Sequence, residues 1–221
     1  MYRWRLTHSS AATDAEYLGG IHCALGRADA YDGWGVTTDS FERSMTALAS
    51  SCRSDSVQVD FWFKRSSTDP AAELEAQASS GIDVLGYLGH GSMWGWSSDP
   101  VLLNSTLAGG WVNPRGFVLL SWTCFDGAFV GPWGDSLAWS LVRNPRGGAL
   151  LATAATTLEE PRLLEELAEE LLCRLTSGGA SRFGDALREA KAALAGRSPE
   201  LTDLLLTYAL LGDPTLPNPW R

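Results

Sequence analysis

The feature that most constrains the fold of this chain is the stretch GFVLLSW at residues 116–122, in which almost every residue is apolar. A strand with one face in water alternates apolar and polar residues, whereas a parallel strand covered by helices on both faces is apolar throughout. The stretches IDVLGYL (82–88) and GGALLATA (147–154) have the same character, and VQVDFWF (57–63) is rich in β-branched and aromatic residues. These stretches predict a parallel sheet that is buried on both faces.

Helical patterns separate the predicted strands. Apolar residues at helical spacing predict a helix over about 38–49, and Asp69-Pro70 has the form of a helix start. Further helices are expected over 135–142, 161–176, 180–196 and 199–211, a first strand over 2–7, and mostly loop over 9–35. Alternating strands and helices with short connections predict an α/β fold with helices on both faces of the sheet. We expect one domain over residues 1–221.

The charge balance excludes several classes of protein. Lys and Arg total 17 against 26 Asp and Glu, which gives a net charge of −9. We therefore expect no nucleic-acid partner and no polybasic membrane anchor. No apolar run reaches the ~20 residues of a membrane span, so no membrane partner is expected either. The N-terminal residues lack the apolar core of a secretory signal, which favours a cytoplasmic location.

The cysteines are few and scattered. Cys23, Cys52, Cys124 and Cys173 form no C-x-x-C pair, which argues against a zinc ribbon or a thioredoxin-type site. Four cysteines are also too sparse for a disulfide scaffold in a chain of 221 residues, so free thiols in a reducing compartment are expected. No P-loop, G-x-G-x-x-G or G-x-S-x-G motif indicates a nucleotide enzyme or an α/β-hydrolase.

Polar residues that can carry chemistry follow two of the predicted strands. His90 lies between two glycines directly after the strand at 82–88, and Cys124 follows the strand at 116–122. Taken singly, a histidine in a tight turn and a buried cysteine are both common structural features. The stretch between the two residues is long enough for one crossover, and consecutive strands are usually neighbours. His90 and Cys124 are therefore expected side by side, where a histidine activates a thiol as a nucleophile and the Gly91 and Cys124 amides could hold an oxyanion.

These segments resemble the gingipain-type cysteine peptidases of the caspase-like group, to which legumain, separase and the CHAT-domain proteases also belong. SGIDVLGYLGHGSMWGW resembles the family's approach to its catalytic histidine, and SWTCFDGAF resembles the block around its nucleophile. GDSLAWSLVRNPRGGALLATAATT and GDALREAKAAL followed by LLGDPTLP resemble later parts of the catalytic domain. The resemblance is clearest over about residues 57–217. It implies a caspase-like three-layer α/β/α sandwich with a mostly parallel central sheet.

The resemblance also implies an activity. Cys124 would be the nucleophile of a cysteine endopeptidase that acts through a thioester acyl-enzyme, and His90 would protonate the leaving amine. Gly91 and Cys124 would form the oxyanion hole, and neither a cofactor nor a metal would be needed. Asp32 is a candidate for an acid that orients the histidine, although a turn aspartate beside Gly33 is the more common explanation for such a residue. The expected partner is a protein or peptide substrate, and an activating protein is a further candidate, as in a bacterial intracellular defence-type protease.

Further residues near His90 and Cys124 are candidates for contact with the substrate. Trp94, Trp96, Trp122 and Asp126 are candidates for substrate binding, and Trp133 also flanks the predicted site. For the tryptophans, packing in an ordinary core is the alternative. An acidic pocket selecting Arg or Lys before the scissile bond could draw on acidic residues at four positions: Glu42, Asp126, Glu159 and Glu160.

Two alternative functions stay open. The first is an inactive or latent caspase-like domain that acts as a binding or regulatory subunit. The second is a different hydrolase or acyltransferase that uses a cysteine–histidine pair.

Overall fold

A computed structural model describes most of the chain from Ile21 onward. The described residues are 21–28, 40–51, 57–59, 69–96, 103–114, 116–130, 132, 134–177, 179–218 and 220. The strand expected over residues 2–7 lies outside them. No helix among the described residues is both long and apolar enough to cross a membrane.

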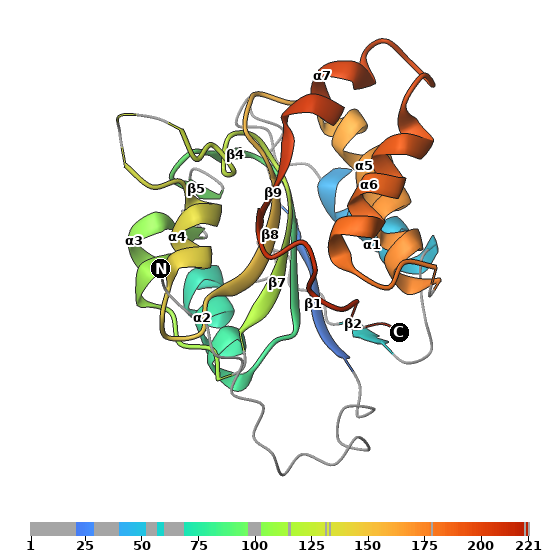
Figure 1. The fold of residues 1–221 in the computed structure, drawn as a ribbon. Coiled ribbons are helices and arrows are strands. Elements are labelled where there is room, and N and C mark those ends of the chain that lie inside the picture. Colours follow the sequence, from blue (N-terminus) through green and yellow to red (C-terminus); the bar gives the residue numbers. More distant parts are fainter. Residues whose placement is uncertain are drawn as a thin grey trace.

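The centre of the fold is a six-stranded sheet with the order β2-β1-β3-β7-β8-β9 (Figure 1). Its strands are β1 (Ile21–Ala28), β2 (Val57–Val59), β3 (Val84–Leu88), β7 (Phe117–Trp122), β8 (Ala149–Ala155) and β9 (Tyr208–Gly212). All neighbours pair in parallel except β8 and β9, which are antiparallel. The mostly parallel sheet predicted from the apolar runs is confirmed.

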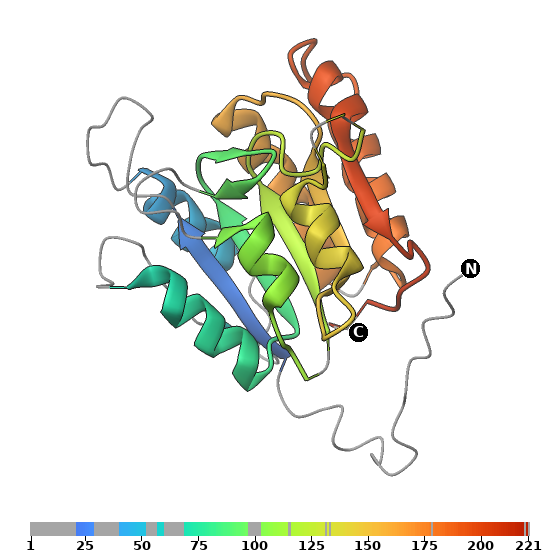
Figure 2. The same cartoon turned by 90° about the vertical axis from the view of Figure 1, so that its left-hand side faces the viewer.

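Helices cover both faces of this sheet, as Figures 1 and 2 show. One face carries α2 (Pro70–Ser80), α3 (Ser105–Gly110) and α4 (Leu137–Arg143). The other carries α1 (Ser40–Ser51), α5 (Pro161–Thr176), α6 (Phe183–Leu194) and α7 (Leu201–Thr207). A small second sheet, β4 (Gly91–Ser92), β5 (Gly95–Trp96) and β6 (Leu103–Asn104), follows β3 at one edge. The expected three-layer α/β/α sandwich is confirmed.

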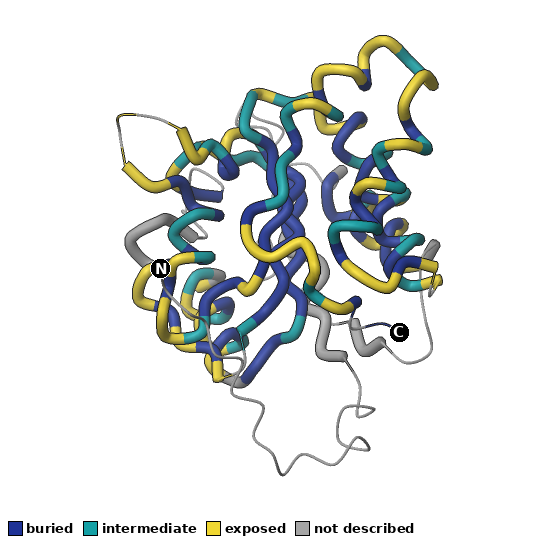
Figure 3. The backbone as a smooth tube through the Cα atoms, in the orientation of Figure 1, coloured by how far each residue is buried: buried dark blue, intermediate teal, exposed yellow. Residues whose placement is uncertain are grey.

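The central strands bury both of their faces, which explains their continuous apolar sequences (Figure 3). In β7, Val118, Leu120 and Trp122 pack with the layer of α1, α5, α6 and α7. Phe117 and Leu119 point to the opposite side and pack with the layer of α2, α3 and α4. Successive side chains of a strand point to opposite faces, so each apolar strand contributes to two separate cores.

The start of α2 follows from its local sequence. The Asp69 carboxylate accepts a hydrogen bond from the Ala72 amide at 3.1 Å, and Pro70 occupies the first helical position of α2, where its missing N–H is not needed. The residues expected on the buried face of the first helix, Phe41, Met45 and Leu48, are buried in α1.

Two predicted elements are wrong. The prediction of mostly loop over residues 9–35 is wrong for Ile21–Ala28, which form β1 between β2 and β3, while the rest of that range lies outside the described residues. The helix expected over 199–211 ends at Thr207, and the chain continues as β9, which pairs with β8. In both cases pairing with a distant strand supplies hydrogen bonds that local sequence does not reveal.

The cysteines also differ from expectation. Cys173, in α5, is disulfide-bonded, so the prediction of four free thiols is wrong. Cys124 is the free cysteine among the described side chains. Because disulfides persist in oxidising environments, cysteine usage does not favour a reducing compartment.

Shortening a leucine in the α5 core tests the packing of this layer. Leu167 is fully buried, whereas Leu206 in α7 is 79% exposed. Leu167→Ala should lower the free energy of unfolding by about 2–5 kcal/mol because it leaves a cavity. Leu206→Ala, the matched control, should change it by no more than about 0.5 kcal/mol. Urea denaturation measures both, and equal effects would contradict this description of the core.

Candidate active site

The sheet brings the His90 and Cys124 segments to one edge. β3 and β7 are parallel neighbours, with Leu88 opposite Trp122, and the Gly89 amide donates to the Trp122 carbonyl at 3.5 Å. His90 and Cys124 each lie two residues beyond that last pair. The two residues therefore leave the carboxyl edge of the sheet at the same level, as their positions in the sequence predict.

A glycine lets the two segments approach closely. A Cβ atom on Gly91 would lie 2.4 Å from Thr123 Oγ1 and 2.8 Å from Thr123 Cγ2. Real Cβ atoms do not approach other heavy atoms so closely, so only glycine fits against the residue that precedes Cys124. The contact joins the His90 turn directly to the segment that carries the thiol.

His90 is half-buried and held at its backbone and its ring. The Tyr87 hydroxyl donates to the His90 carbonyl at 2.7 Å. The Phe41 ring meets the imidazole edge-on, with 5.2 Å between ring centres. The imidazole Nε2 is buried and has no hydrogen-bond partner among the described residues. The ring is thus fixed in place by packing, with one nitrogen uncommitted.

The Cys124 thiol is engaged by the segment that follows β8. The Glu159 amide donates to Cys124 Sγ at 3.4 Å, and the thiol donates to the Glu159 carbonyl at 3.5 Å. Within the described residues no hydrogen bond joins this thiol to His90. Burial raises the pKa of Cys124, the charges of Glu159 and Asp126 raise it further, and the hydrogen bond from the Glu159 backbone opposes them. The thiol is therefore protonated at neutral pH in this arrangement.

The Glu159 side chain is itself fixed by two threonines. Its Oε1 accepts hydrogen bonds from Thr157 Oγ1 at 2.7 Å and from Thr207 Oγ1 at 2.5 Å. The Thr156 amide and hydroxyl both donate to the Thr207 carbonyl. Neither Thr157 nor Thr207 was identified from the sequence. Their shared contact forms only because Thr207, at the end of α7, is brought to Glu159 by the fold.

The turn after Cys124 is also tied to this segment. The Phe125 amide donates to the Thr157 carbonyl at 3.0 Å, and the Gly127 amide donates to the Ala155 carbonyl at 2.9 Å. Phe125 has a φ of 61°, a left-handed conformation that is unfavourable for a bulky side chain. Such strain is retained only where surrounding contacts enforce it, and the two hydrogen bonds do so here.

Asp126 belongs to the same turn, and its side chain is fully buried. Its Oδ2 accepts hydrogen bonds from Ser121 Oγ and, at 2.9 Å, from Trp96 Nε1. Burial raises the pKa of this carboxyl to about 7, and the hydrogen bonds from Ser121 and Trp96 oppose the increase. A carboxyl group in this position titrates near neutrality rather than as an ordinary surface acid.

The structure separates the candidates for substrate binding. Trp94 is 49% exposed, in the turn between β4 and β5, and remains a candidate. Trp96, Trp122 and Asp126 are fully buried, which does not fit the predicted contact with substrate. Burial on both faces of the sheet explains Trp122, and the hydrogen bond between Trp96 and Asp126 explains the other two. Asp32 and Trp133 lie outside the described residues.

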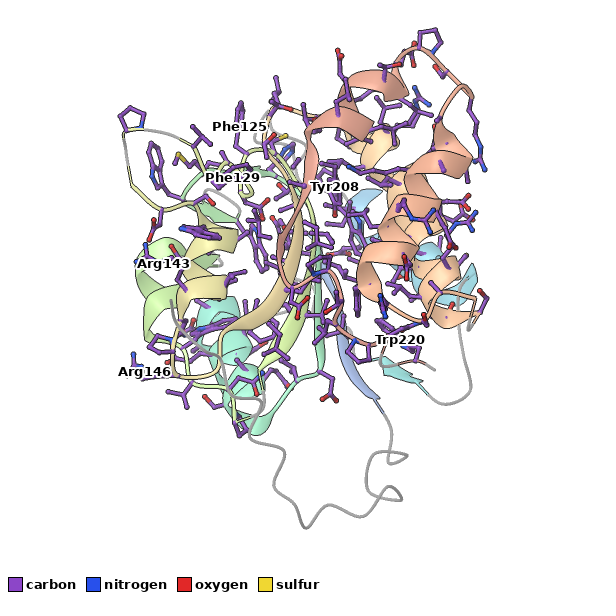
Figure 4. All side chains as sticks on the ribbon, viewed as in Figure 1. Phe125, Phe129, Arg143, Arg146, Tyr208 and Trp220 are labelled. Carbon is purple, nitrogen blue, oxygen red and sulfur yellow. The ribbon has the colours of Figure 1, made fainter. Side chains whose placement is uncertain are left out.

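Exposed apolar side chains that the sequence did not single out border the Cys124 segment. Phe125 and Phe129 are exposed at the edge of the sheet from which Cys124 emerges (Figure 4). Val130 follows in the same loop, and Leu158 lies next to Glu159. Large exposed apolar residues gathered in one region mark surfaces that bind other molecules.

The acidic candidates differ in accessibility. Glu42 is buried in α1, and Glu160, before α5, is exposed. Glu159 is half-buried and is the one whose backbone contacts the thiol. Among the described residues, no three His, Cys, Asp or Glu side chains cluster in a way that could hold a metal ion.

Comparison with known proteins gives a family and a fold. The model of Peptidase family C25 matches residues 4–219. The structure is similar to gingipain R, an Arg-specific cysteine proteinase, with a TM-score of 0.73 and 17% identity over 91% of this chain and 48% of that one. It is also similar to the Porphyromonas gingivalis RgpB complex of pro- and mature domains, with a TM-score of 0.68 and 18% identity over 90% and 48% of the chains. A search of curated protein sequences found no match.

A third solved structure, described as a protease, has a TM-score of 0.66 and 11% identity over 90% of this chain and 49% of its own. The chain thus spans about half the length of the solved structures that it matches. At these identities the structural likeness establishes the gingipain-like fold.

The titration of Asp126 can be measured through stability. Its pKa of about 7 in the folded protein exceeds the ordinary 3.8, so the folded state holds a proton that the unfolded chain has released. The contribution of Asp126 to the free energy of unfolding should therefore be fully present below its unfolded pKa of 3.8. It should be lost as the pH rises through the folded pKa of about 7. Asp126→Asn removes this titrating group, so urea unfolding at a series of pH values should show the variant gaining stability relative to wild type as the pH rises, by up to ~4 kcal/mol. Parallel pH profiles would contradict the assignment.

The contact between Gly91 and Thr123 gives a second test. Gly91→Ala places a methyl group against Thr123, and overpacking of this kind lowers the free energy of unfolding by about 1–3 kcal/mol. Adding Thr123→Ala removes the two closest atoms and should recover part of the loss in a thermal denaturation experiment. If Thr123→Ala gives no recovery, the two segments do not meet as described.

Proposed function

Because the chain belongs to peptidase family C25, we propose that it is a cysteine endopeptidase whose reaction uses Cys124 and His90. The observation that carries the proposal is the parallel pairing of β3 with β7, which delivers both residues to one edge of the sheet. The contact of Gly91 with Thr123 supports it, because it leaves no room for another element between the two segments. A cysteine next to a histidine is the arrangement that nucleophilic catalysis of acyl transfer requires.

The proposed reaction has two stages. His90 takes the proton of the Cys124 thiol, and the thiolate attacks the carbonyl carbon of the scissile peptide bond. His90 then gives that proton to the nitrogen as the C–N bond breaks. The amine product leaves, and the acyl group remains on Sγ as a thioester. Water then attacks the thioester carbonyl carbon, and His90 takes a proton from that water and passes it to Sγ as the C–S bond breaks. The carboxylic acid product leaves, and the Cys124 thiol is restored.

Backbone amides are proposed to stabilise the negative charge that forms on the carbonyl oxygen. The Gly91 and Cys124 amides come from the two segments that the sheet brings together. Backbone donors that are fixed before the reaction stabilise an oxyanion without reorganising during it. No cofactor or metal has a part in this proposal.

The exposed apolar residues are the proposed contact surface for the substrate chain. Trp94, Phe125, Phe129 and Leu158 all lie in segments at or next to the carboxyl edge of the sheet. Their burial under a bound peptide would contribute favourable free energy in proportion to the apolar area covered.

A basic residue before the scissile bond fits the acidic groups near the thiol. Glu159 offers a half-buried carboxylate that Thr157 and Thr207 hold in position, and its backbone contacts Sγ. Gingipain R, which the fold resembles, is described as Arg-specific. We therefore expect cuts after Arg or Lys, with Glu159 as the proposed partner of the cation.

A latent form of the peptidase is the second candidate function, and one observation favours it. The thiol is hydrogen-bonded to the Glu159 backbone, and its pKa is raised, mainly by burial. A substrate or an activating protein that moved residues 156–160 would release Sγ toward His90. A relative of the fold forms a complex between a pro-domain and the mature domain, which is a precedent for control by a protein segment.

The cytoplasmic location and the intracellular defence role stay predictions. Any test of them has to account for the disulfide at Cys173, because cytosolic thiols are usually kept reduced.

Incubation of the protein with a diverse peptide pool tests the proposed activity. Mass spectrometry should find cuts after Arg or Lys that are absent with Cys124→Ala and strongly reduced with His90→Ala. Glu159→Gln should lower kcat/KM for basic sites by about 10-fold or more, because it removes the charge that pairs with the cation. Cuts that persist with Cys124→Ala would refute the assignment of the nucleophile.

A further inference from the structure

We propose that Trp96 and Asp126 form a buried positioning pair, which holds the His90–Gly91 turn against the loop that carries Cys124. The inference rests on the proposed function, because it assigns these residues a role in aligning the two reacting groups. Neither side chain is proposed to touch the substrate, since both are fully buried.

Asp126 connects the pair to the nucleophile. It lies two residues after Cys124, and its backbone carbonyl accepts a hydrogen bond from the Ala138 amide at the start of α4. Its carboxyl accepts from Ser121 in β7 and from Trp96 in β5. The side chain therefore joins the turn after β7 to the small sheet that follows His90.

Trp96 connects the pair to the histidine through two contacts. In the β4–β5 hairpin it pairs with Gly91, the residue next to His90. Its ring also stacks on Tyr87, with 4.3 Å between ring centres and an angle of 6° between the planes. The Tyr87 hydroxyl donates to the His90 carbonyl at 2.7 Å, so the stack reaches the histidine backbone from the other side.

The physical cost of this arrangement indicates a role beyond packing. A carboxyl group with no exposed surface loses its hydration, and Asp126 Oδ1 has no hydrogen-bond partner among the described residues. Well-packed apolar residues at such positions are often as stabilising as buried charged groups, or more so. The carboxyl group instead fixes one orientation of Trp96. The indole has a single N–H, and it can reach the Asp126 oxygen only when the ring is turned toward that residue.

Four variants separate alignment from stability. Trp96→Phe keeps an aromatic ring against Tyr87 but removes the donor, and Asp126→Ala removes the acceptor. The double variant tests whether the two act together, and Asp126→Asn restores an acceptor without the acid. Asn218→Ala is the control. Asn218 is also buried, and it donates to the carbonyls of Leu175, in the last turn of α5, and of Ala180, in the segment that follows that helix.

Loss of either member of the pair should lower kcat much more than it changes KM. With the best substrate from the peptide pool, Trp96→Phe and Asp126→Ala should each lower kcat by about 10- to 100-fold, while KM changes by less than about 3-fold. The double variant should be no slower than the slower single variant, because either change already breaks the link. Asp126→Asn should recover at least half of the lost activity on a logarithmic scale. Asn218→Ala should leave kcat within about 2-fold of wild type.

The rate at which iodoacetamide alkylates Cys124 gives a readout that needs no peptidase activity. His90→Ala should slow alkylation if the imidazole stabilises the thiolate. Trp96→Phe should slow it to a similar extent, and Asn218→Ala should not change it.

The outcomes distinguish the two proposals. If His90→Ala leaves the alkylation rate unchanged, both the cysteine–histidine pair and the positioning role are wrong. If His90→Ala slows alkylation but Trp96→Phe does not, the positioning role alone is overturned. Losses in kcat that add in the double variant, or that Asn218→Ala reproduces, also overturn it.

Discussion

The parallel pairing of β3 with β7 determines where every other part of the proposed site lies. Hydrogen bonds along these strands set Leu88 opposite Trp122, so the turns that follow emerge together from a buried sheet. Gly91 against Thr123 then brings the turns into contact, and the loop after β8 closes over the thiol through Glu159. Because the strands are buried on both faces, a shift of register would disturb both cores at once, which makes the placement robust.

Burial and nearby negative charge raise the pKa of the Cys124 thiol, which keeps it protonated. The Cys124 thiol lies close to two acidic residues, Glu159 and Asp126, in a half-buried position that disfavours the thiolate. Reaction therefore requires a group that reverses this balance, and the proposed group is the His90 imidazole. A cationic substrate side chain beside Glu159 would help by neutralising one of the opposing charges. The acidic surroundings would then link binding of the correct substrate to formation of the nucleophile.

Local sequence patterns predict the centre of the fold well. Continuous apolar runs identify β3, β7 and β8, and the order of these strands along the chain is enough to place His90 near Cys124. The same patterns miss β1 and β9, because the strand structure of both depends on pairing with distant partners.

The surroundings of the site are less predictable for the same reason. The sequence predicts Trp96 and Asp126 at a substrate surface, since it shows their position near the site but not their mutual hydrogen bond. The hydrogen bond from Thr207 to Glu159 likewise depends on how the end of α7 meets the segment that follows β8. Contacts between residues far apart in sequence leave no local pattern in a single chain.

The most direct test of the central claim is a crystal structure of the protein with a peptide aldehyde bound at Cys124. We predict a covalent bond from Sγ to the aldehyde carbon and release of Sγ from the Glu159 backbone. The former carbonyl oxygen should lie about 2.7–3.1 Å from the amides of Gly91 and Cys124, with the His90 ring facing the same carbon. An adduct whose oxygen points away from the Gly91 amide would contradict this description of the site. So would an adduct in which the His90 ring is turned away from the bound carbon.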